Sequence, residues 1–92
     1  MAGERFYTRA AREIVDKYES VIGEAAEGIA KKNDNVEFED GEVKSFDGGA
    51  EELDGLVQEY VDTVGDVALR LAQQVLNGME GAGEADLPDR LA

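Results

Sequence analysis

IVDKYESVIGEAAEGIAKK, residues 14–32, and LVQEYVDTVGDVALRLAQQ, residues 56–74, are two versions of one pattern. At an offset of 42 residues they share the form (I/L)-V-x-x-Y-x-x-x-(I/V)-G-x-x-A-x-x-(I/L)-A. Two unrelated amphipathic helices would share the aliphatic positions by chance, but less readily a tyrosine and a glycine in register. The pattern therefore predicts an internal duplication, with two structurally equivalent helices related by a pseudo-twofold axis.

Both segments extend outward into long amphipathic helices. Apolar residues recur in steps of four and three across residues 7–25 and again across 53–71, which is the spacing of one helix face. This periodicity predicts a first helix over residues 4–32 and a second over residues 50–76. Asn77-Gly78 is a typical stop signal at the end of the second helix.

A stripe of small residues runs beside the bulky stripe on each predicted helix. Glycine inside a helix costs about 0.5–1 kcal/mol relative to alanine, so its presence at the same place twice indicates close approach of a neighbouring backbone. The alternative is that the glycines are only tolerated and the alanines are exposed helix formers. With a tyrosine from each helix, these residues are the candidate interface: Tyr18, Gly23, Ala26, Ala30, Tyr60, Gly65, Ala68 and Ala72.

If both stripes are contact surfaces, each helix needs two neighbours, whereas a helical hairpin supplies only one. Two chains that form a four-helix bundle would supply both. The sequence therefore predicts a mainly α fold, in which two long antiparallel helices are joined by a short β-hairpin. It also predicts that two chains form a homodimer, with a higher helical oligomer as the alternative. A chain of this length buries a limited fraction of its surface, which also favours oligomerisation.

The hairpin is predicted from VEFEDGEV, residues 36–43. The pair Asp40-Gly41 suits a type I′ turn, which needs positive φ at both central positions. A two-residue loop at this place sets Glu37 opposite Lys44, where the two form a cross-strand ion pair. The apolar residues of the two strands then share one face that must be covered: Val36, Phe38 and Val43. The alternative is an irregular acidic loop.

We expect one domain over residues 1–78. Residues 79–92 are small, acidic and interrupted by Pro88, and we expect them to be a disordered tail in which Leu87 and Leu91 are candidates for a short docking element. Three arginines at the start of the first helix are expected to pair with acids of a neighbouring chain or to form a small basic patch: Arg5, Arg9 and Arg12.

The charge is strongly negative, with 22 acidic residues against nine basic ones and a net charge of −13. An acidic, lysine-poor surface on a periodic core is typical of proteins from a high-salt cytosol, where a Debye length of about 3 Å screens self-repulsion. The alternative is an ordinary acidic mesophilic protein. No run approaches the roughly 18 apolar residues of a membrane span, and the first residues lack the apolar core of a signal peptide, so we expect a cytoplasmic location.

The amino-acid composition also limits which catalytic and metal-binding sites the chain can form. The chain has no histidine and no cysteine, so the usual general bases, nucleophile–base pairs and nitrogen or sulfur metal ligands are missing. An EF-hand reading of the acidic hairpin fails because counting back from Gly41 puts Val36 at the first ligand position. We therefore expect no catalytic residues, no cofactor and no dedicated metal site.

The function expected from the sequence is that of a small non-enzymatic interaction or accessory protein that associates with itself and is adapted to high salt. The alternative is a DNA-associated or transcription-linked regulator, which is disfavoured because nucleic-acid binding normally requires a basic footprint. The sequence leaves the identity of any further protein partner open.

Overall fold

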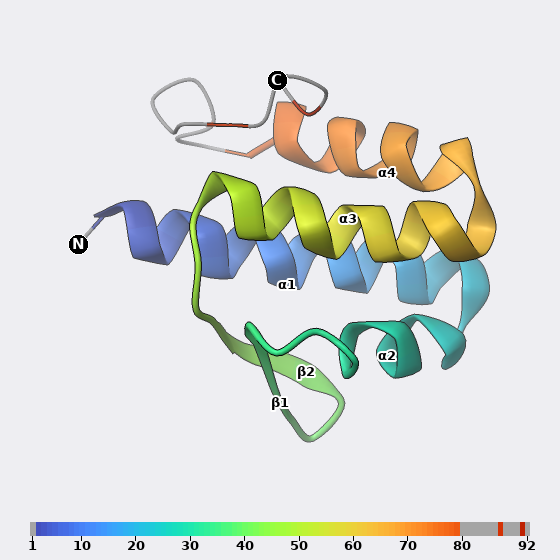
Figure 1. Cartoon of the computed structure of the whole chain (residues 1–92), viewed down its shortest axis with the longest axis horizontal. Coiled ribbons are helices and arrows are strands. Elements are labelled where there is room, and N and C mark those ends of the chain that lie inside the picture. Colours follow the sequence, from blue (N-terminus) through green and yellow to red (C-terminus); the bar gives the residue numbers. More distant parts are fainter. Residues whose placement is uncertain (1, 80–86, 88–90, 92) are drawn as a thin grey trace.

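The computed structural model describes residues 2–79, 87 and 91, which form four helices and a two-stranded antiparallel sheet (Figure 1). In chain order the elements are α1 (Ala2–Ile22), α2 (Ala25–Ala30), β1 (Val36–Glu39), β2 (Glu42–Phe46), α3 (Ala50–Val64) and α4 (Asp66–Asn77). The predictions of a mainly α fold and of a β-hairpin in the middle of the chain are confirmed. The hairpin separates a first half, α1 and α2, from a second half, α3 and α4. The predicted stop at Asn77-Gly78 is also found, since α4 ends at Asn77.

Each predicted long helix is divided by its repeat glycine. Gly23 separates α1 from α2 with φ 69°, and Gly65 separates α3 from α4 with φ 91°. Positive φ is readily accessible to glycine and strained for other residues, so the helical backbone turns at these two points. The prediction of two long uninterrupted helices is therefore not confirmed.

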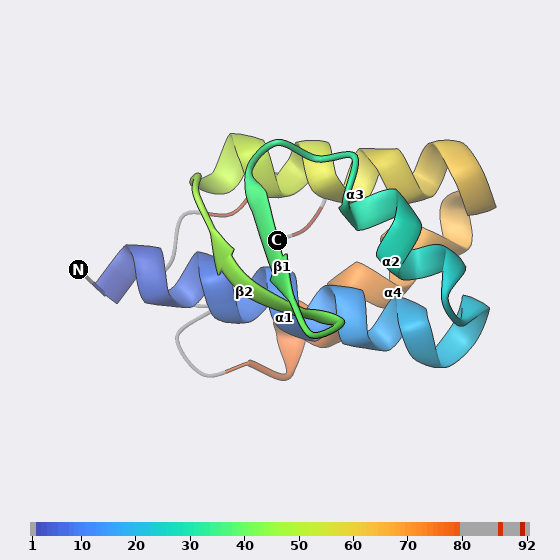
Figure 2. The same ribbon diagram turned by 90° about the horizontal axis from the view of Figure 1, so that it is seen from below.

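The four helices are arranged so that α1 and α3 run in the same direction, as the colours in Figure 1 show. After each glycine the chain reverses, and α2 and α4 run back along the molecule. Helix α4 covers one side of the α1–α3 pair, while α2 and the hairpin lie on the opposite side (Figures 1 and 2). Both α2 and α4 contact α1 and α3, so each half supplies neighbours to the other.

This arrangement explains why a bundle made by two chains is not confirmed. Two chains are needed only if each helix has two contact surfaces and a single neighbour within its own chain. The glycine turns supply the second neighbour within one chain, because each helix folds back against itself and against the other half. The predicted antiparallel relation also differs from the structure, since the leading segments α1 and α3 are parallel. The homodimer itself stays a prediction.

The core is apolar and draws on all four helices and on β2. Among the residues whose burial the structure describes, none of the buried ones is polar or charged. Leu91, from the predicted tail, is also buried, and Leu87 packs against the same core. The rest of that tail beyond Met79 lies outside the described residues, and so does the prediction that it is disordered.

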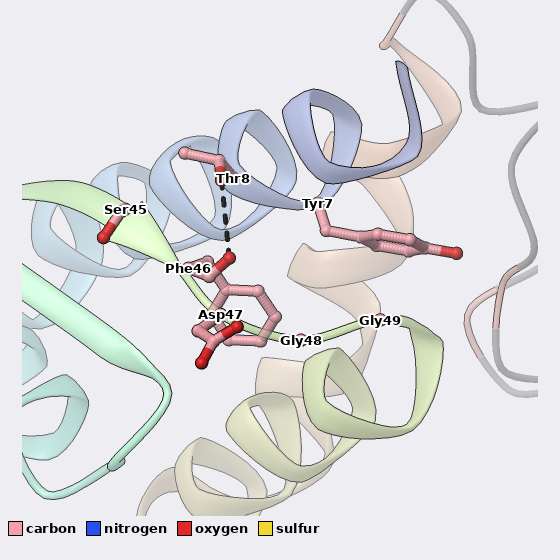
Figure 3. A pocket seen from close by; sticks show the side chains of 7 residues that line it. All are labelled: Tyr7, Thr8, Ser45, Phe46, Asp47, Gly48 and Gly49. Atoms are coloured by element: carbon pink, nitrogen blue, oxygen red, sulfur yellow. Dashed lines mark hydrogen bonds between the residues drawn. The ribbon is translucent and has the colours of Figure 1, made fainter. Parts of the chain in front are cut away.

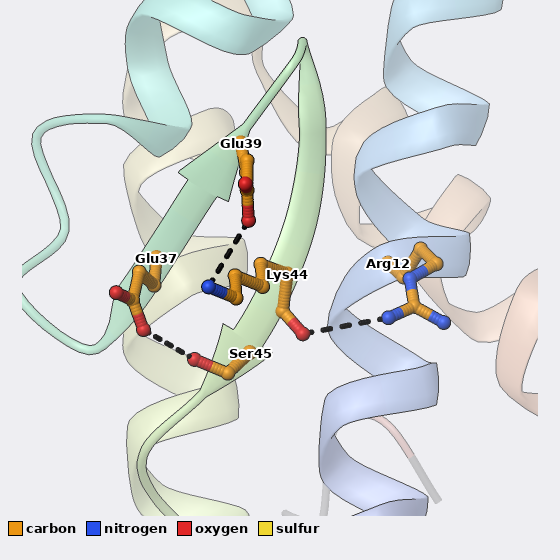
Figure 4. Close-up of polar contacts among 5 residues, drawn as sticks. All are labelled: Arg12, Glu37, Glu39, Lys44 and Ser45. Carbon is orange, nitrogen blue, oxygen red and sulfur yellow. Dashed lines mark hydrogen bonds and ion pairs between the residues drawn. The ribbon is translucent and has the colours of Figure 1, made fainter.

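The hairpin turn has the predicted form but the strands have a different register. Asp40 and Gly41 both have positive φ, at 56° and 80°, as a type I′ turn requires. A β-bulge next to Phe38 then shifts the pairing, so that Glu37 lies opposite Ser45 and accepts a 2.9 Å hydrogen bond from its hydroxyl (Figure 4). The predicted Glu37–Lys44 ion pair is wrong.

The bulge has a packing reason. Val43 and Phe46 are three positions apart, so in a regular strand they would point to opposite faces of the sheet. One extra residue, Lys44, allows both to be buried against the helices. Lys44 itself stays exposed, and its Nζ lies 3.0 Å from Oε2 of Glu39. The apolar face is covered as predicted, since Val43 is buried and Val36 and Phe38 pack against the core.

Two side chains of α1 form hydrogen bonds with the backbone of β2. Arg12 donates through Nε to the carbonyl of Val43 at 3.0 Å. It also donates through Nη2 to the carbonyl of Lys44 at 3.5 Å (Figure 4). Thr8 donates to the carbonyl of Phe46 at 3.5 Å. The side chain predicted to meet acids of another chain or to join a basic patch therefore satisfies the backbone of β2, which explains how a two-stranded sheet is stabilised.

Candidate functional site

The two repeat tyrosines meet in the middle of the molecule, between α1 and α3. The rings of Tyr18 and Tyr60 are tilted by 34° with their centroids 4.0 Å apart, and both residues are buried. The Tyr18 hydroxyl donates a 2.7 Å hydrogen bond to the carbonyl of Ala68, and the Tyr60 hydroxyl donates a 2.6 Å hydrogen bond to that of Ala26. Each tyrosine therefore binds the opposite half of the chain.

These contacts are equivalent under the repeat. Tyr18 corresponds to Tyr60 and Ala26 to Ala68, so one hydrogen bond maps onto the other at the offset of 42 residues. The glycine turns match in the same way, because each glycine N–H binds the carbonyl four residues earlier and each glycine carbonyl accepts from the alanine three residues later. This matching geometry supports the predicted pseudo-twofold relation between the halves, while a duplication of the sequence stays a prediction.

The Tyr60 phenol is a hydrogen-bond donor in a structural contact. Burial raises the pKa of Tyr60 above its ordinary value of 10.0, and the neighbouring Tyr18 and the carboxylates of Glu19 and Glu59 raise it further. A phenol in this environment stays protonated and donates a hydrogen bond. The pair holds α1 and α3 together and fixes the segments that follow the two glycines.

The repeat glycines serve a different purpose from the one predicted. A Cβ added at Gly23 or at Gly65 would meet no atom within 4 Å, and both residues are exposed. Within the chain these glycines therefore permit no close backbone approach. Their shared property is the positive φ that ends one helix and starts the next.

The repeat alanines lie inside the chain. All four are completely buried and belong to the core cluster: Ala26, Ala30, Ala68 and Ala72. The alternative in which they are exposed helix formers is excluded for this fold. The structure thus brings the tyrosines and alanines of the candidate interface together within one molecule. A role for any of the eight residues between chains stays a prediction.

Several carboxylates lie close enough to one another to interact electrostatically. We call this group the acidic face. It lies on α1, α2 and the start of β2 and consists of Glu13, Asp16, Glu19, Glu27 and Glu42. Partial burial raises the pKa of Asp16, as do Glu42 and Glu13, against an opposing effect of Arg12. Burial also raises the pKa of Glu19, with Asp16, Glu27 and Glu42 adding to the shift. Ionisation of Asp16 and of Glu19 is therefore unfavourable for the folded chain.

An open hollow of about 630 Å³ lies where β2 leads into α3, beside the start of α1 (Figure 3). Its walls include the rings of Tyr7 and Phe46 and the backbone of Gly48-Gly49. Two of its hydroxyl-bearing side chains are already engaged, because Thr8 donates to the carbonyl of Phe46 and Ser45 donates to Glu37. The hollow offers aromatic and backbone surface, without a nucleophile paired to a base among the residues that line it.

Three positioning residues were not identified from the sequence. The sequence indicated only the charge of Arg12 and gave no reason to select Thr8, yet both hydrogen-bond to β2. The third is Glu52, whose side chain accepts a 2.7 Å hydrogen bond from the backbone N–H of Gly49 at the start of α3. The last contact had a readable signal, since a glutamate at the third helical position often binds the N-cap backbone. The other two depend on how β2 lies across α1, which no local pattern encodes.

Comparisons with known proteins give no relative: no protein-family model, no curated protein sequence and no solved structure matches the chain. Within the described residues, no histidine, cysteine, aspartate or glutamate group has the geometry to hold a metal ion. Of the helices in that part of the chain, none combines the length and the apolar character needed to cross a bilayer.

Proposed function

We propose that the chain is a small non-enzymatic interaction protein of a salt-rich cytosol, which associates with a second copy of itself. The acidic face carries the part of this proposal that concerns adaptation to salt. It sets five carboxylates on neighbouring elements, and the pKa values of Asp16 and Glu19 are raised in part by that crowding. Such a surface costs folding stability in dilute buffer, whereas molar salt screens the repulsion.

Two further observations support the proposal. The chain lacks both histidine and cysteine, the side chains on which most general-base and nucleophilic catalysis near neutral pH depends. Val21 and Val67 are 54% and 50% exposed, the large hydrophobic side chains left open among the described residues. Val21 lies just before the Gly23 turn and Val67 just after the Gly65 turn, and apolar surface beside these turns suits contact with a second copy.

The DNA-associated alternative gains no support from three of the described basic residues. Arg12 binds backbone carbonyls of β2, Lys31 lies 3.0 Å from Glu27, and Lys44 lies 3.0 Å from Glu39. These cations are engaged within the chain and surrounded by excess acid, which opposes the approach of a phosphate backbone.

Chemical denaturation across a series of KCl concentrations tests the environmental part of the proposal. We expect the free energy of unfolding to rise steadily from dilute buffer to molar KCl. Unchanged stability over this range would contradict a salt-adapted surface. Sedimentation equilibrium in molar KCl tests self-association separately, and a single-chain mass at every concentration up to millimolar would contradict it.

A further inference from the structure

Helix α4 is joined to the rest of the molecule by one residue. Helix α3 ends at Val64 and α4 begins at Asp66, so Gly65 alone makes the reversal. Its φ of 91° and ψ of −167° lie in a region of conformation that is essentially restricted to glycine. Because Gly65 is exposed and a Cβ there would meet nothing within 4 Å, backbone conformation rather than packing sets the turn.

The sequence on the two sides of Gly65 also fits one continuous helix. The apolar positions of α3 and α4 keep the same four-and-three spacing across the glycine, with Tyr60 and Val64 followed by Ala68, Leu71 and Val75. Residues 50–77 thus have two arrangements that respect their periodicity. One is bent at Gly65, as in the structure, and the other is straight.

A straightened α4 would leave the slot that it fills against α1 and α3. In that slot α4 buries Ala68, Ala72 and Leu76, and the Ala68 carbonyl accepts the hydrogen bond from Tyr18. A straight helix exposes this apolar surface on α4 and also empties the slot. A second copy that is straightened in the same way offers an empty slot with the same residues.

We infer that two copies of this chain can exchange α4, with Gly65 as the hinge. Each α4 then fills the slot of the other molecule, and the Tyr18–Ala68 hydrogen bond joins the two chains. The inference rests on the self-association proposed above and specifies its surface. The packing of α4 is the same in the monomer and in the exchanged dimer. The equilibrium between them therefore depends on the conformation at residue 65 and on protein concentration.

Gly65→Ala tests the hinge, with Gly55→Ala as the matched control. Alanine is strained in the bent form and favoured in a continuous helix, so the two effects together should shift the equilibrium toward the exchanged dimer by about tenfold or more. Gly55 lies within α3, outside the positive-φ region, with nothing within 4 Å of an added Cβ. Gly55→Ala should therefore leave the equilibrium between monomer and dimer as it is in the unsubstituted chain.

Sedimentation velocity in molar KCl, at a concentration where the unsubstituted chain is monomeric, gives the first readout. We expect a two-chain mass for Gly65→Ala and a one-chain mass for Gly55→Ala. A folded, monomeric Gly65→Ala protein at every concentration overturns the inference. If Gly65→Ala fails to fold, the unsubstituted chain is unfolded and refolded at millimolar concentration, and the absence of any dimer from that sample overturns it as well.

Isotope-filtered NOE spectra of a dimer mixed from labelled and unlabelled chains give the second readout. We expect contacts between the Tyr18 ring and Ala68 to connect different chains. A dimer in which these contacts stay within one chain overturns the exchange, yet keeps the proposed self-association. No dimer under any condition, including molar KCl at millimolar concentration, contradicts both.

Discussion

Tyr18 and Tyr60 stack against each other with ring centroids 4.0 Å apart, and each hydroxyl binds the carbonyl of the alanine that lies three residues after the other half's glycine. The turn in each half is thereby fixed by a tyrosine from the other half. These reciprocal hydrogen bonds hold the two similar helical segments together in one folded unit. They also give the two tyrosines equal roles, which can be measured.

Tyr18→Phe and Tyr60→Phe should destabilise the protein by similar amounts. Each change removes one buried hydroxyl donor and keeps the ring, so the expected cost is about 0.5–1.5 kcal/mol for each variant. Urea denaturation in molar KCl measures both. A clear loss for one variant and none for the other would contradict equivalent roles, and a double-mutant cycle would show whether the two hydrogen bonds are coupled.

Alkaline pH should destabilise the fold through Tyr60. Burial raises the pKa of this phenol in the folded chain above its ordinary value of 10.0, so the folded state keeps a proton that the unfolded state loses. The stabilising contribution is complete below about pH 10 and is lost as the pH rises through the folded-state pKa. Denaturation midpoints at rising pH should fall for the unsubstituted chain. The fall should be smaller in Tyr60→Phe, and an equal fall in both proteins would assign the effect to other groups.

Neutralising the acidic face should weaken the dependence on salt. The raised pKa values of Asp16 and Glu19 mean that their ionisation opposes folding, so stability in dilute buffer should fall as the pH rises from about 4 through the folded-state pKa values. The double variant Asp16→Asn, Glu19→Gln should be more stable than the unsubstituted chain in dilute buffer and close to it in molar KCl. The control is Glu51→Gln in the first turn of α3, where an acid favours the helix dipole and its loss should not stabilise. An unchanged salt slope in the double variant would remove the acidic face as the source of the salt effect.

Arg12 should matter more to the hairpin than Lys44 does. Arg12→Ala removes the donor to two carbonyls of β2, and hydrogen bonds from a charged group contribute about 1.5–3 kcal/mol. Lys44→Ala removes an exposed ion pair with Glu39, for which a loss of about 0.2–1 kcal/mol is typical. Thermal unfolding of the two variants compares these losses, and equal losses would contradict the greater contribution of Arg12.

Part of this fold could be predicted from the sequence because its signals are local. Helical periodicity placed most residues of the four helices, Asp40-Gly41 gave the turn type, and Asn77-Gly78 gave the last helix end. The repeat identified the tyrosines and alanines that the structure brings together at the junction of the two halves. In each case the residue type is tied to a conformation or to a face that short-range spacing defines.

The missed features depend on contacts between distant elements. A glycine inside a periodic helix is compatible with a straight helix or with a turn, and the choice here depends on whether α4 packs against α1 in the same chain. The strand register depends on the bulge that buries Val43 and Phe46 together, which requires knowledge of the helices beneath them. Local spacing cannot supply that information.

The two halves of the molecule pack around Tyr18 and Tyr60 within one chain. NOE spectra between the two tyrosine rings test this packing, recorded in molar KCl on a sample of confirmed single-chain mass. We predict strong ring-to-ring contacts in that sample, because the centroids are 4.0 Å apart. A folded single chain without contacts between these rings would contradict the account.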